Sequence, residues 1–303
     1  MELINIKGNT FYIKGGTNTG VYIYGDNTAL IIDPGLSGSR PKRIINMLEL
    51  NNINLKFIIN THEHNDHYGA CNQFREHYKN LYILSSEYAK LYIEYPDLLS
   101  RYIIGGKSNE FMDGKLKSKS LEKIDIDKTL KEGIVSLNSV DFTIIDFKGH
   151  TSGSIGILTK DKVLFVGDLL IGSEMLSKYD FLFIYDLQEY IKSINKLKII
   201  DFEYLVLGHG KDTITKQDSR ELIKKHEDAI NKYINQIREE LNTSMGLENL
   251  LKKIVVKNNL RNNYKAYHFF KSSLVSVISY LVELQEIDYI LSDGELLYYT
   301  KKK

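Results

Sequence analysis

The sequence has little of the residues that cross-link, break or anchor a chain. Cys71 is the one cysteine among 303 residues, so no disulfide can form within the chain, which suits a reducing compartment. The three prolines leave no proline-rich linker, and no apolar run approaches the roughly 20 residues that span a bilayer. The N-terminal residues form neither a basic region nor an apolar core, so we expect no signal peptide. We therefore expect a soluble, cytoplasmic protein without a membrane partner.

The charges are almost balanced. Lys and Arg number 40 and Asp and Glu number 39, and the formal net charge of +1 points to no partner of either sign. Hydrophobic residues make up 43% and charged residues 26%, which is ordinary for a globular protein. A chain of this length is long enough for one large domain or two smaller ones, so its function has to be sought in its motifs.

One stretch of seven residues, from Thr61 to His67, organises the chain. It contains four metal-binding side chains, those of His62, His64, Asp66 and His67. The apolar run over 55–60 predicts a short buried strand before it, and a helix is predicted from Tyr68 to about His77. Open α/β architectures place their chemistry on such loops at strand ends. Imidazole and carboxylate ligands together suit zinc, iron or manganese, so we predict a metal site here.

Three later strands also lead into a histidine or an aspartate. Strands predicted over 140–147, 163–166 and 204–207 are followed by His150, Asp168 and His209. A glycine precedes each of the three, and glycine permits a close approach of the backbone to an ion or ligand. The repeated placement predicts that these side chains belong to the same site. The remaining histidines, His77, His226 and His268, lack this context, and we expect them to be surface or packing residues.

The rest of the first two thirds predicts a layered α/β domain. Four strands are predicted within 2–33, with a hairpin turn at 25–27, and helices are predicted over 41–50, 86–101 and 187–199. Residues 103–130 are polar and contain glycine. We expect them to form a long excursion, either covering the site or lying as a surface loop.

The pattern changes after residue 215. Helices are predicted over 217–241 and 247–256, and one or two more over 264–284. Two short strands, 287–291 and 295–299, then flank the turn residues Ser292, Asp293 and Gly294, which predicts a hairpin. Helices followed by a hairpin resemble a winged helix. We therefore divide the chain into a catalytic domain, 1–215, and a helical, winged-helix-like domain, 216–303.

This C-terminal region contains a locally basic segment. Between Glu248 and Glu283 there are no acidic residues and six basic ones: Lys252, Lys253, Lys257, Arg261, Lys265 and Lys271. Aromatic residues are interleaved with them over 264–270. The segment is either a surface that attracts an anionic substrate such as nucleic acid, or a solvated helical face above core aromatics. A dimer interface is a further alternative for the region.

The motifs together resemble those of the metallo-β-lactamase-fold hydrolases, in order and context, from about residue 2 to 215. The motifs are Thr61-His62-x-His64-x-Asp66-His67, Gly149-His150-Thr151, Gly167-Asp168 and Gly208-His209-Gly210. The resemblance implies a four-layer αβ/βα sandwich with a metal site at one edge of two facing sheets. It implies that His62, His64 and His150 hold one metal, that Asp66, His67 and His209 hold a second, and that Asp168 bridges them. It also places Asp33 behind the ligands, where it would fix their orientation.

Such a site implies a metal-dependent hydrolase. Two divalent ions, zinc in the first place and iron or manganese as alternatives, would share a hydroxide that attacks a carbonyl carbon or a phosphorus. Asp66 would also accept or pass on a proton. We expect an ester, thioester or lactone of a small molecule as the substrate.

Three further observations bear on the branch of the superfamily. Glyoxalase II-type thioesterases resemble the site but usually carry other residues where Gly210 and Ser154 stand. True β-lactamases usually have another residue at the position of Asp168. The Gly208-His209-Gly210 motif and the helical tail resemble the β-lactamase-like endoribonucleases, so single-stranded RNA is the runner-up substrate. A nucleic-acid-binding module with a vestigial metal site is the alternative from another class.

Overall fold

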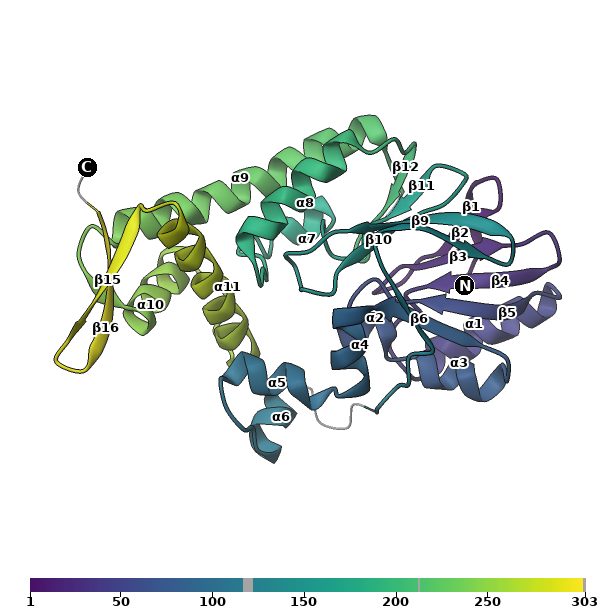
Figure 1. Cartoon of the computed structure of the whole chain (residues 1–303), viewed down its shortest axis with the longest axis horizontal. Coiled ribbons are helices and arrows are strands. Elements are labelled where there is room, and N and C mark those ends of the chain that lie inside the picture. Colours follow the sequence, from purple (N-terminus) through teal and green to yellow (C-terminus); the bar gives the residue numbers. More distant parts are fainter. Residues whose placement is uncertain (117–121, 212, 302–303) are drawn as a thin grey trace.

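Two β-sheets face each other at the centre of the computed structural model, which describes residues 1–116, 122–211 and 213–301 (Figure 1). Within the described residues, the first sheet has seven strands in the order of the chain, β1 to β7. They are β1 Ile4–Lys7, β2 Thr10–Ile13, β3 Thr19–Ile23, β4 Thr28–Ile32, β5 Asn54–Ile59, β6 Tyr82–Ser86 and β7 Lys128–Leu130. The pairs from β1 to β4 are antiparallel and those from β4 to β7 are parallel.

The second sheet follows the order β13-β12-β11-β10-β9-β8 in the described part of the chain. Its strands are β8 Gly133–Leu137, β9 Val140–Asp146, β10 Ile155–Leu158, β11 Val163–Phe165, β12 Tyr204–Val206 and β13 Ile214–Thr215. Strands β11 and β12 are parallel, and the other pairs are antiparallel. Parallel strands send their carboxyl ends to one edge of each sheet, and the predicted site residues follow those ends.

Three apolar clusters hold the layers together. The cluster between the sheets includes Tyr22, Leu30, Phe142 and Ile157, all fully buried. A second cluster lies between the first sheet and its helices, and a third lies on the outer face of the second sheet. The four layers are therefore helix, sheet, sheet and helix, as the resemblance implied.

The helices of the first two thirds cover the outer faces and the site edge (Figure 1). They are α1 Ser39–Leu50, α2 Asn65–Tyr68, α3 Cys71–His77, α4 Glu87–Glu94, α5 Asp97–Ile104, α6 Glu110–Leu116, α7 Ser173–Leu176 and α8 Leu187–Ile199. Helix α1 buries Ile44 and Leu48 against the first sheet, and α8 buries Ile194 and Leu197 against the second.

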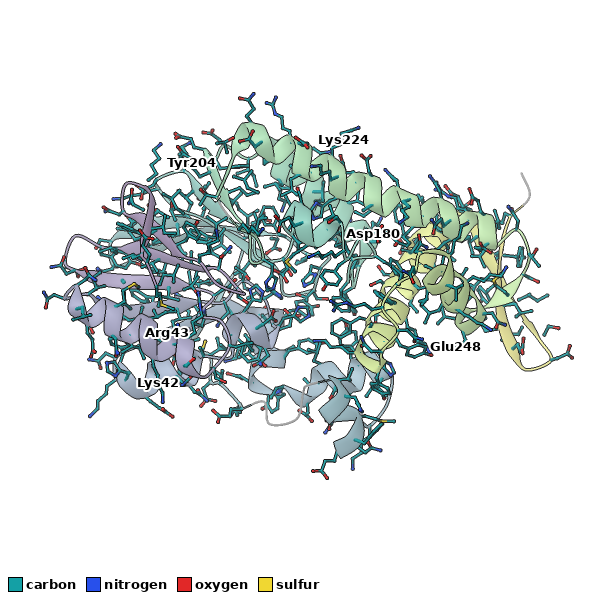
Figure 2. The ribbon with its side chains drawn as sticks, turned by 180° about the vertical axis from the view of Figure 1, so that it is seen from behind. Lys42, Arg43, Asp180, Tyr204, Lys224 and Glu248 are labelled. Carbon is teal, nitrogen blue, oxygen red and sulfur yellow. The ribbon has the colours of Figure 1, made fainter. Side chains whose placement is uncertain are left out.

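The C-terminal region follows the predicted pattern. Helix α9 (Lys216–Glu240) leads to α10 (Leu247–Lys257) and a single helix α11 (Tyr264–Glu283). The hairpin of β15 (Ile287–Ser292) and β16 (Glu295–Thr300) pairs with the short strand β14 (Met245–Gly246). Glu248, labelled in Figure 2, joins α10 to α11 by accepting a hydrogen bond from Tyr267 and pairing with Lys271. The apolar cluster on the second sheet continues into these helices, and the division at residue 215 stays a prediction.

Three predictions of secondary structure are wrong in part. The helix predicted from Tyr68 to about His77 begins at Cys71, because a turn at Gly69 and Ala70 separates α3 from the short helix α2. The helix predicted over 86–101 is two helices, α4 and α5, because Pro96 lacks an N–H and disfavours a helical conformation at Tyr95, which has φ −128° and ψ 70°. The excursion over 103–130 contains α6 and the edge strand β7, and its residues 117–121 lie outside the described residues. The patterns also missed strands β6 and β8. In residues 1–116, 122–211 and 213–301, no helix combines the length and apolar character needed to cross a membrane.

Candidate metal centre

All seven predicted ligand residues converge at one edge of the facing sheets. His62 to His67 follow β5, His150 lies between β9 and β10, Asp168 follows β11, and His209 follows β12. Because these strands present their ends to the same edge, residues up to 147 positions apart in the chain, such as His62 and His209, lie in one cluster. Two groups of potential ligands are formed there by the described residues.

The first group comprises His62, His64, His150 and Asp168, whose ligand atoms all lie within 4.8 Å of one another. His64 Nδ1 is 3.1 Å from His62 Nε2 and 3.0 Å from His150 Nε2. Asp168 Oδ2 is 3.9 Å from His62 Nε2 and 3.8 Å from His150 Nε2. Three imidazole nitrogens and a carboxylate oxygen around one point form a donor set that suits a divalent transition metal.

The second group comprises Asp66, His67 and His209, with ligand atoms within the same 4.8 Å limit. His209 Nε2 is 3.1 Å from Asp66 Oδ2 and 3.4 Å from His67 Nε2. Asp168 faces this group as well, because its Oδ1 is 3.4 Å from His67 Nε2 and its Oδ2 is 3.4 Å from His209 Nε2. Asp168 therefore stands between the two groups, which is the position expected of a bridging carboxylate.

Backbone carbonyls orient two of the imidazoles. His150 Nδ1 lies 3.0 Å from the Phe183 carbonyl oxygen, and His209 Nδ1 lies 2.6 Å from the Gly16 carbonyl oxygen. A carbonyl oxygen only accepts, so each Nδ1 must carry the proton and donate. The Nε2 lone pair of both rings is then left to point into the cluster, as a metal ligand requires.

Asp33 orients a ligand of each group. Its Oδ2 lies 2.8 Å from His67 Nδ1 and accepts a 2.6 Å hydrogen bond from Thr61 Oγ1. Thr61 Oγ1, whose proton is used in this bond, lies 3.0 Å from His62 Nδ1 and accepts from it. Asp33 is buried and has a left-handed φ of 53°, which Asp tolerates better than most residues. The place of Asp33 behind the ligands agrees with what the resemblance implied.

Among the residues that the structure describes, two buried polar atoms at the centre have no hydrogen-bond partner. They are His64 Nε2 and Asp168 Oδ1. His64 is also the ring that presents Nδ1, rather than Nε2, to its neighbours. A buried carboxylate oxygen without a hydrogen bond is costly unless a positive charge lies close to it; His67 Nε2, at 3.4 Å, or a bound cation would supply that charge. The residues present therefore fit a pair of divalent ions.

The electrostatics of the two groups differ. Burial lowers the pKa of His62, His64 and His150, and brings that of His64 to about 3. Burial acts in the same direction on His67 and His209, but the nearby carboxylates together outweigh it, Asp168 and Asp33 at His67 and Asp168 and Asp66 at His209, and raise the pKa values to about 10 and about 11. The first group thus offers neutral imidazoles. In the second group, the carboxylates favour a positive charge beside the imidazoles, which a bound cation would supply.

Two glycines, Gly167 and Gly208, allow the loops after β11 and β12 to approach the other residues of the site closely. A Cβ on Gly208 would meet Asp168 Oδ1 at 2.4 Å and His67 Cε1 at 2.7 Å. A Cβ on Gly167, which has a φ of 53°, would meet Thr61 Oγ1 at 2.6 Å. All three separations are shorter than those that real Cβ atoms show, so the backbone at Gly167 and Gly208 approaches the site as closely as the glycines predicted.

Sequence reasoning missed Glu63, which lies between two of the ligands in the chain. Its Oε2 accepts a 2.8 Å hydrogen bond from Thr151 Oγ1, and burial raises its pKa to about 7. This bond ties the loop after β5 to the loop that carries His150. An acidic residue inside a buried motif was the available signal. His226 was predicted to be a surface or packing residue, and it is a packing residue, because its ring is fully buried and hydrogen-bonded to the backbone of Leu222 and Ile171.

Comparisons with known proteins identify the family. The model of the metallo-beta-lactamase superfamily matches residues 13–209, and the chain belongs to this superfamily. A crystal structure of a beta-lactamase domain protein from Burkholderia ambifaria superposes with a TM-score of 0.78 and 15% identity, covering 99% of this chain and 94% of that one. A metallo-beta-lactamase family protein from Thermus thermophilus gives 0.69 and 16%, with 94% of each chain covered. The predicted four-layer fold is thereby confirmed.

Curated relatives are named as hydrolases. The hydroxyacylglutathione hydrolase GloC of Haemophilus influenzae is 32% identical over 204 residues, which are 64% of this chain and 86% of the relative. The hydroxyacylglutathione hydrolase 1 of Vibrio vulnificus is 26% identical over 266 residues, which are 82% of this chain and 89% of the relative. The protein is accordingly a metal-binding hydrolase of the metallo-β-lactamase superfamily.

Proposed function

We propose that this hydrolase uses two divalent ions, most simply zinc, to cleave an ester, thioester or lactone of a small molecule. The observation that carries the proposal is the position of Asp168 between two complete groups of ligands. His62, His64 and His150 would hold one ion, and Asp66, His67 and His209 the other. Two such ions, when bound, supply a nucleophile at neutral pH and polarise the oxygen under attack.

The chain's own residues contribute orientation and proton handling. The hydrogen bonds of Asp33, Thr61, Phe183 and Gly16 fix the rings, so that little reorganisation is needed when substrate binds. Asp66 is the more open of the two carboxylates, with 41% of its side chain exposed against 10% for Asp168. We assign to Asp66 the second role of accepting a proton at the solvent side of the centre.

The surroundings of the centre favour a small molecule over RNA. Of the basic segment, Lys253 and Lys257 pair with Glu240 at the end of α9, and Lys271 pairs with Glu248. These glutamates partly neutralise the segment and weaken its attraction for a phosphate backbone. The cavities beside the ligands are walled mainly by apolar side chains. RNA and the nucleic-acid-binding module therefore gain no support from these surroundings, and a homodimer stays a prediction.

A substrate panel tests the proposal. Metal-loaded protein is assayed with a thioester, a lactone, an aryl ester, a phosphodiester and a short RNA, beside the variant His62→Ala. We expect hydrolysis of a carbonyl substrate and its loss in the variant. Cleavage of RNA alone, or equal activity of the variant, would overturn the proposal.

A further inference from the structure

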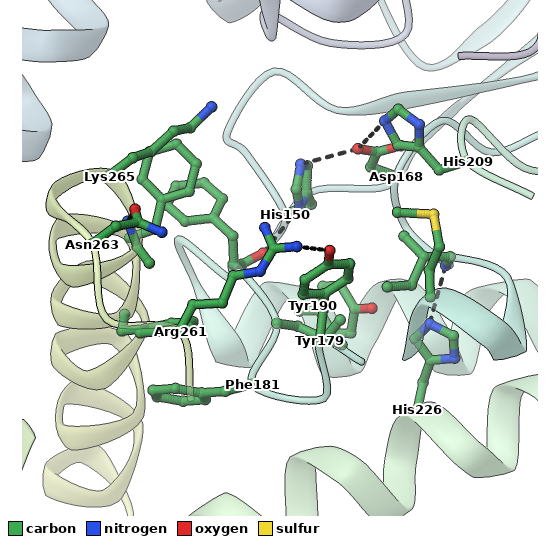
Figure 3. Close-up of a pocket in the computed structure, with 17 residues that line it drawn as sticks. His150, Asp168, Tyr179, Phe181, Tyr190, His209, His226, Arg261, Asn263 and Lys265 are labelled. Carbon is green, nitrogen blue, oxygen red and sulfur yellow. Dashed lines mark hydrogen bonds and ion pairs between the residues drawn. The ribbon is translucent and has the colours of Figure 1, made fainter. Parts of the chain in front are cut away.

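A side chamber of about 280 Å³ opens directly onto the metal centre (Figure 3). His150, Asp168 and His209 line one part of it. The opposite wall comes from the start of α11 and the residues just before it, Arg261 to Phe270. The segment from Ile171 to Phe183, between β11 and α8, supplies the remaining wall. A group attached to the scissile bond can therefore reach this chamber without leaving the site.

The walls of the chamber are apolar and largely aromatic. They include Ile171, Met175, Phe181, Phe183, Phe269 and Phe270. Ring contacts hold several of them: Phe181 stacks on Phe270 with 5.4 Å between ring centroids, and Phe183 lies tilted against Phe269 at 4.8 Å. Phe183 also contacts the rings of His64 and His150, each at 5.6 Å, so the wall is continuous with the ligands. Apolar walls of this kind favour an apolar guest.

The segment that carries Phe181 and Phe183 is anchored on α9. Asp180, labelled in Figure 2, accepts a 2.7 Å hydrogen bond from Tyr233 and pairs with Lys232. Ile184 N–H donates to Ser273 of α11, at 3.1 Å. The chamber wall is therefore held from both C-terminal helices, and its shape is preformed.

Arg261 brings a positive charge to this apolar space. Its guanidinium lies over the Tyr179 ring, with Cζ 4.2 Å from the centroid, and donates to the Tyr179 hydroxyl. Among the described residues, no carboxylate pairs with Arg261, and Figure 3 shows the side chain directed across the chamber. Lys265 also lines the chamber, with Nζ 4.9 Å from the Phe269 centroid. An arginine held by stacking presents a fixed donor fork to a carboxylate or phosphate.

We infer that the substrate joins an aromatic or branched aliphatic group to an anionic group, the first filling the side chamber and the second binding Arg261. This inference rests on the proposed hydrolase function. A cavity on the order of 150 Å³ is enough for benzene, so the chamber accepts a ring with a short substituent. A second cavity of about 390 Å³ meets the centre on the side of α5 and α6 and leaves room for the other half of the substrate.

Two sets of thioesters test the inference, because the guest can belong to either half of the substrate. The first set keeps N-acetylcysteamine as the thiol and carries acetyl, phenylacetyl or 4-carboxyphenylacetyl groups. The second keeps the acetyl group on N-acetylcysteamine, benzyl mercaptan or 4-carboxybenzyl mercaptan. In one of the two sets, we expect kcat/KM to be about tenfold higher for the plain aromatic substrate than for the substrate without a ring. We expect it to be about tenfold higher again for the carboxylated aromatic substrate.

Three variants locate the effect. Ala266 lines the chamber, and Ala266→Leu should fill it and remove the gain that the ring confers. Arg261→Gln should reduce the ratio of kcat/KM between the carboxylated and plain aromatic substrates to about one, and Arg261→Lys should restore part of it. Lys252→Gln, an exposed lysine on α10 outside the chamber, is the matched control and should leave both ratios unchanged. Metal content and circular dichroism show that each variant is folded.

The outcomes distinguish failure of this inference from failure of the proposed hydrolase function. Equal kcat/KM for acetyl and aromatic substrates in both sets would overturn the chamber assignment while leaving the hydrolase intact. A ratio unaffected by Arg261→Gln would overturn the assignment of the anion. Failure to hydrolyse any thioester, the acetyl compound included, would overturn the proposed function and the inference with it.

Discussion

The ligand edge and the side chamber meet at the same centre but are held by different means. At the edge, hydrogen bonds to the Asp33 carboxylate and to the backbone carbonyls of Phe183 and Gly16 orient the imidazoles. In the chamber, ring stacking and contacts from α9 and α11 hold the wall. Changes at the edge should therefore affect metal binding and all substrates, whereas changes in the chamber should affect the choice among substrates. The predictions below test this difference.

The largest effect is expected for Asp168→Asn. The substitution removes the negative charge that faces both ligand groups. It should weaken the binding of the two ions, which together stabilise the transition state of hydrolysis by several kcal/mol. Hydrolysis should fall on the order of a thousandfold. Equal kcat/KM for wild type and variant, at saturating zinc, would show that Asp168 does not link the two groups.

The second-largest effect is expected for Gly208→Ala. Its Cβ would lie 2.4 Å from Asp168 Oδ1, so the carboxylate has to move. A displacement of about 1 Å costs on the order of a hundredfold in rate. Gly25→Ala is the control, because a Cβ at Gly25 meets nothing within 4 Å. Steady-state kinetics should show a large loss of hydrolysis rate for Gly208→Ala and none for Gly25→Ala.

Asp33→Asn keeps the shape but weakens the hydrogen bonds to Thr61 and His67. Loss of such a partner behind a ligand typically lowers metal affinity by about 10- to 100-fold. Competition with a chelator measures the affinity. Asp293→Asn, in the distant hairpin and also at a positive φ of 52°, is the control and should bind metal as the wild type does. A wild-type affinity for Asp33→Asn would contradict its role.

The smallest effect concerns His226, a buried residue that lines the chamber. Burial lowers its pKa from 6.5 to about 4. The unfolded chain therefore takes up a proton on this ring at a pH where the folded protein does not, so stability is lost as the pH falls from about 6.5 towards 4. Between pH 7 and 5 the loss should be about 2 kcal/mol smaller in His226→Gln than in the wild type. Urea unfolding at the two pH values measures it, and identical pH dependence would refute the assignment.

The sequence predicted the ligand edge better than the chamber. Four ligands lie within six consecutive residues, and the other three follow strands next to glycine, so their chemistry and placement were visible in the chain. Pro96 shows how one residue can divide a predicted helix. The chamber depends on apolar and aromatic residues such as Phe183, Phe269 and Tyr179, whose types fit any core. Their contacts join segments some 80 residues apart, and no local pattern reports such a meeting.

Metal stoichiometry tests the central claim, that two ligand groups share Asp168, most directly. Elemental analysis of the wild type, His150→Ala and His209→Ala should give about two, one and one divalent ions per chain, because each substitution removes a ligand from one group. Exposed lysine variants such as Lys252→Gln should retain about two. One ion in the wild type, or loss of both ions in either histidine variant with the fold intact, would contradict the account.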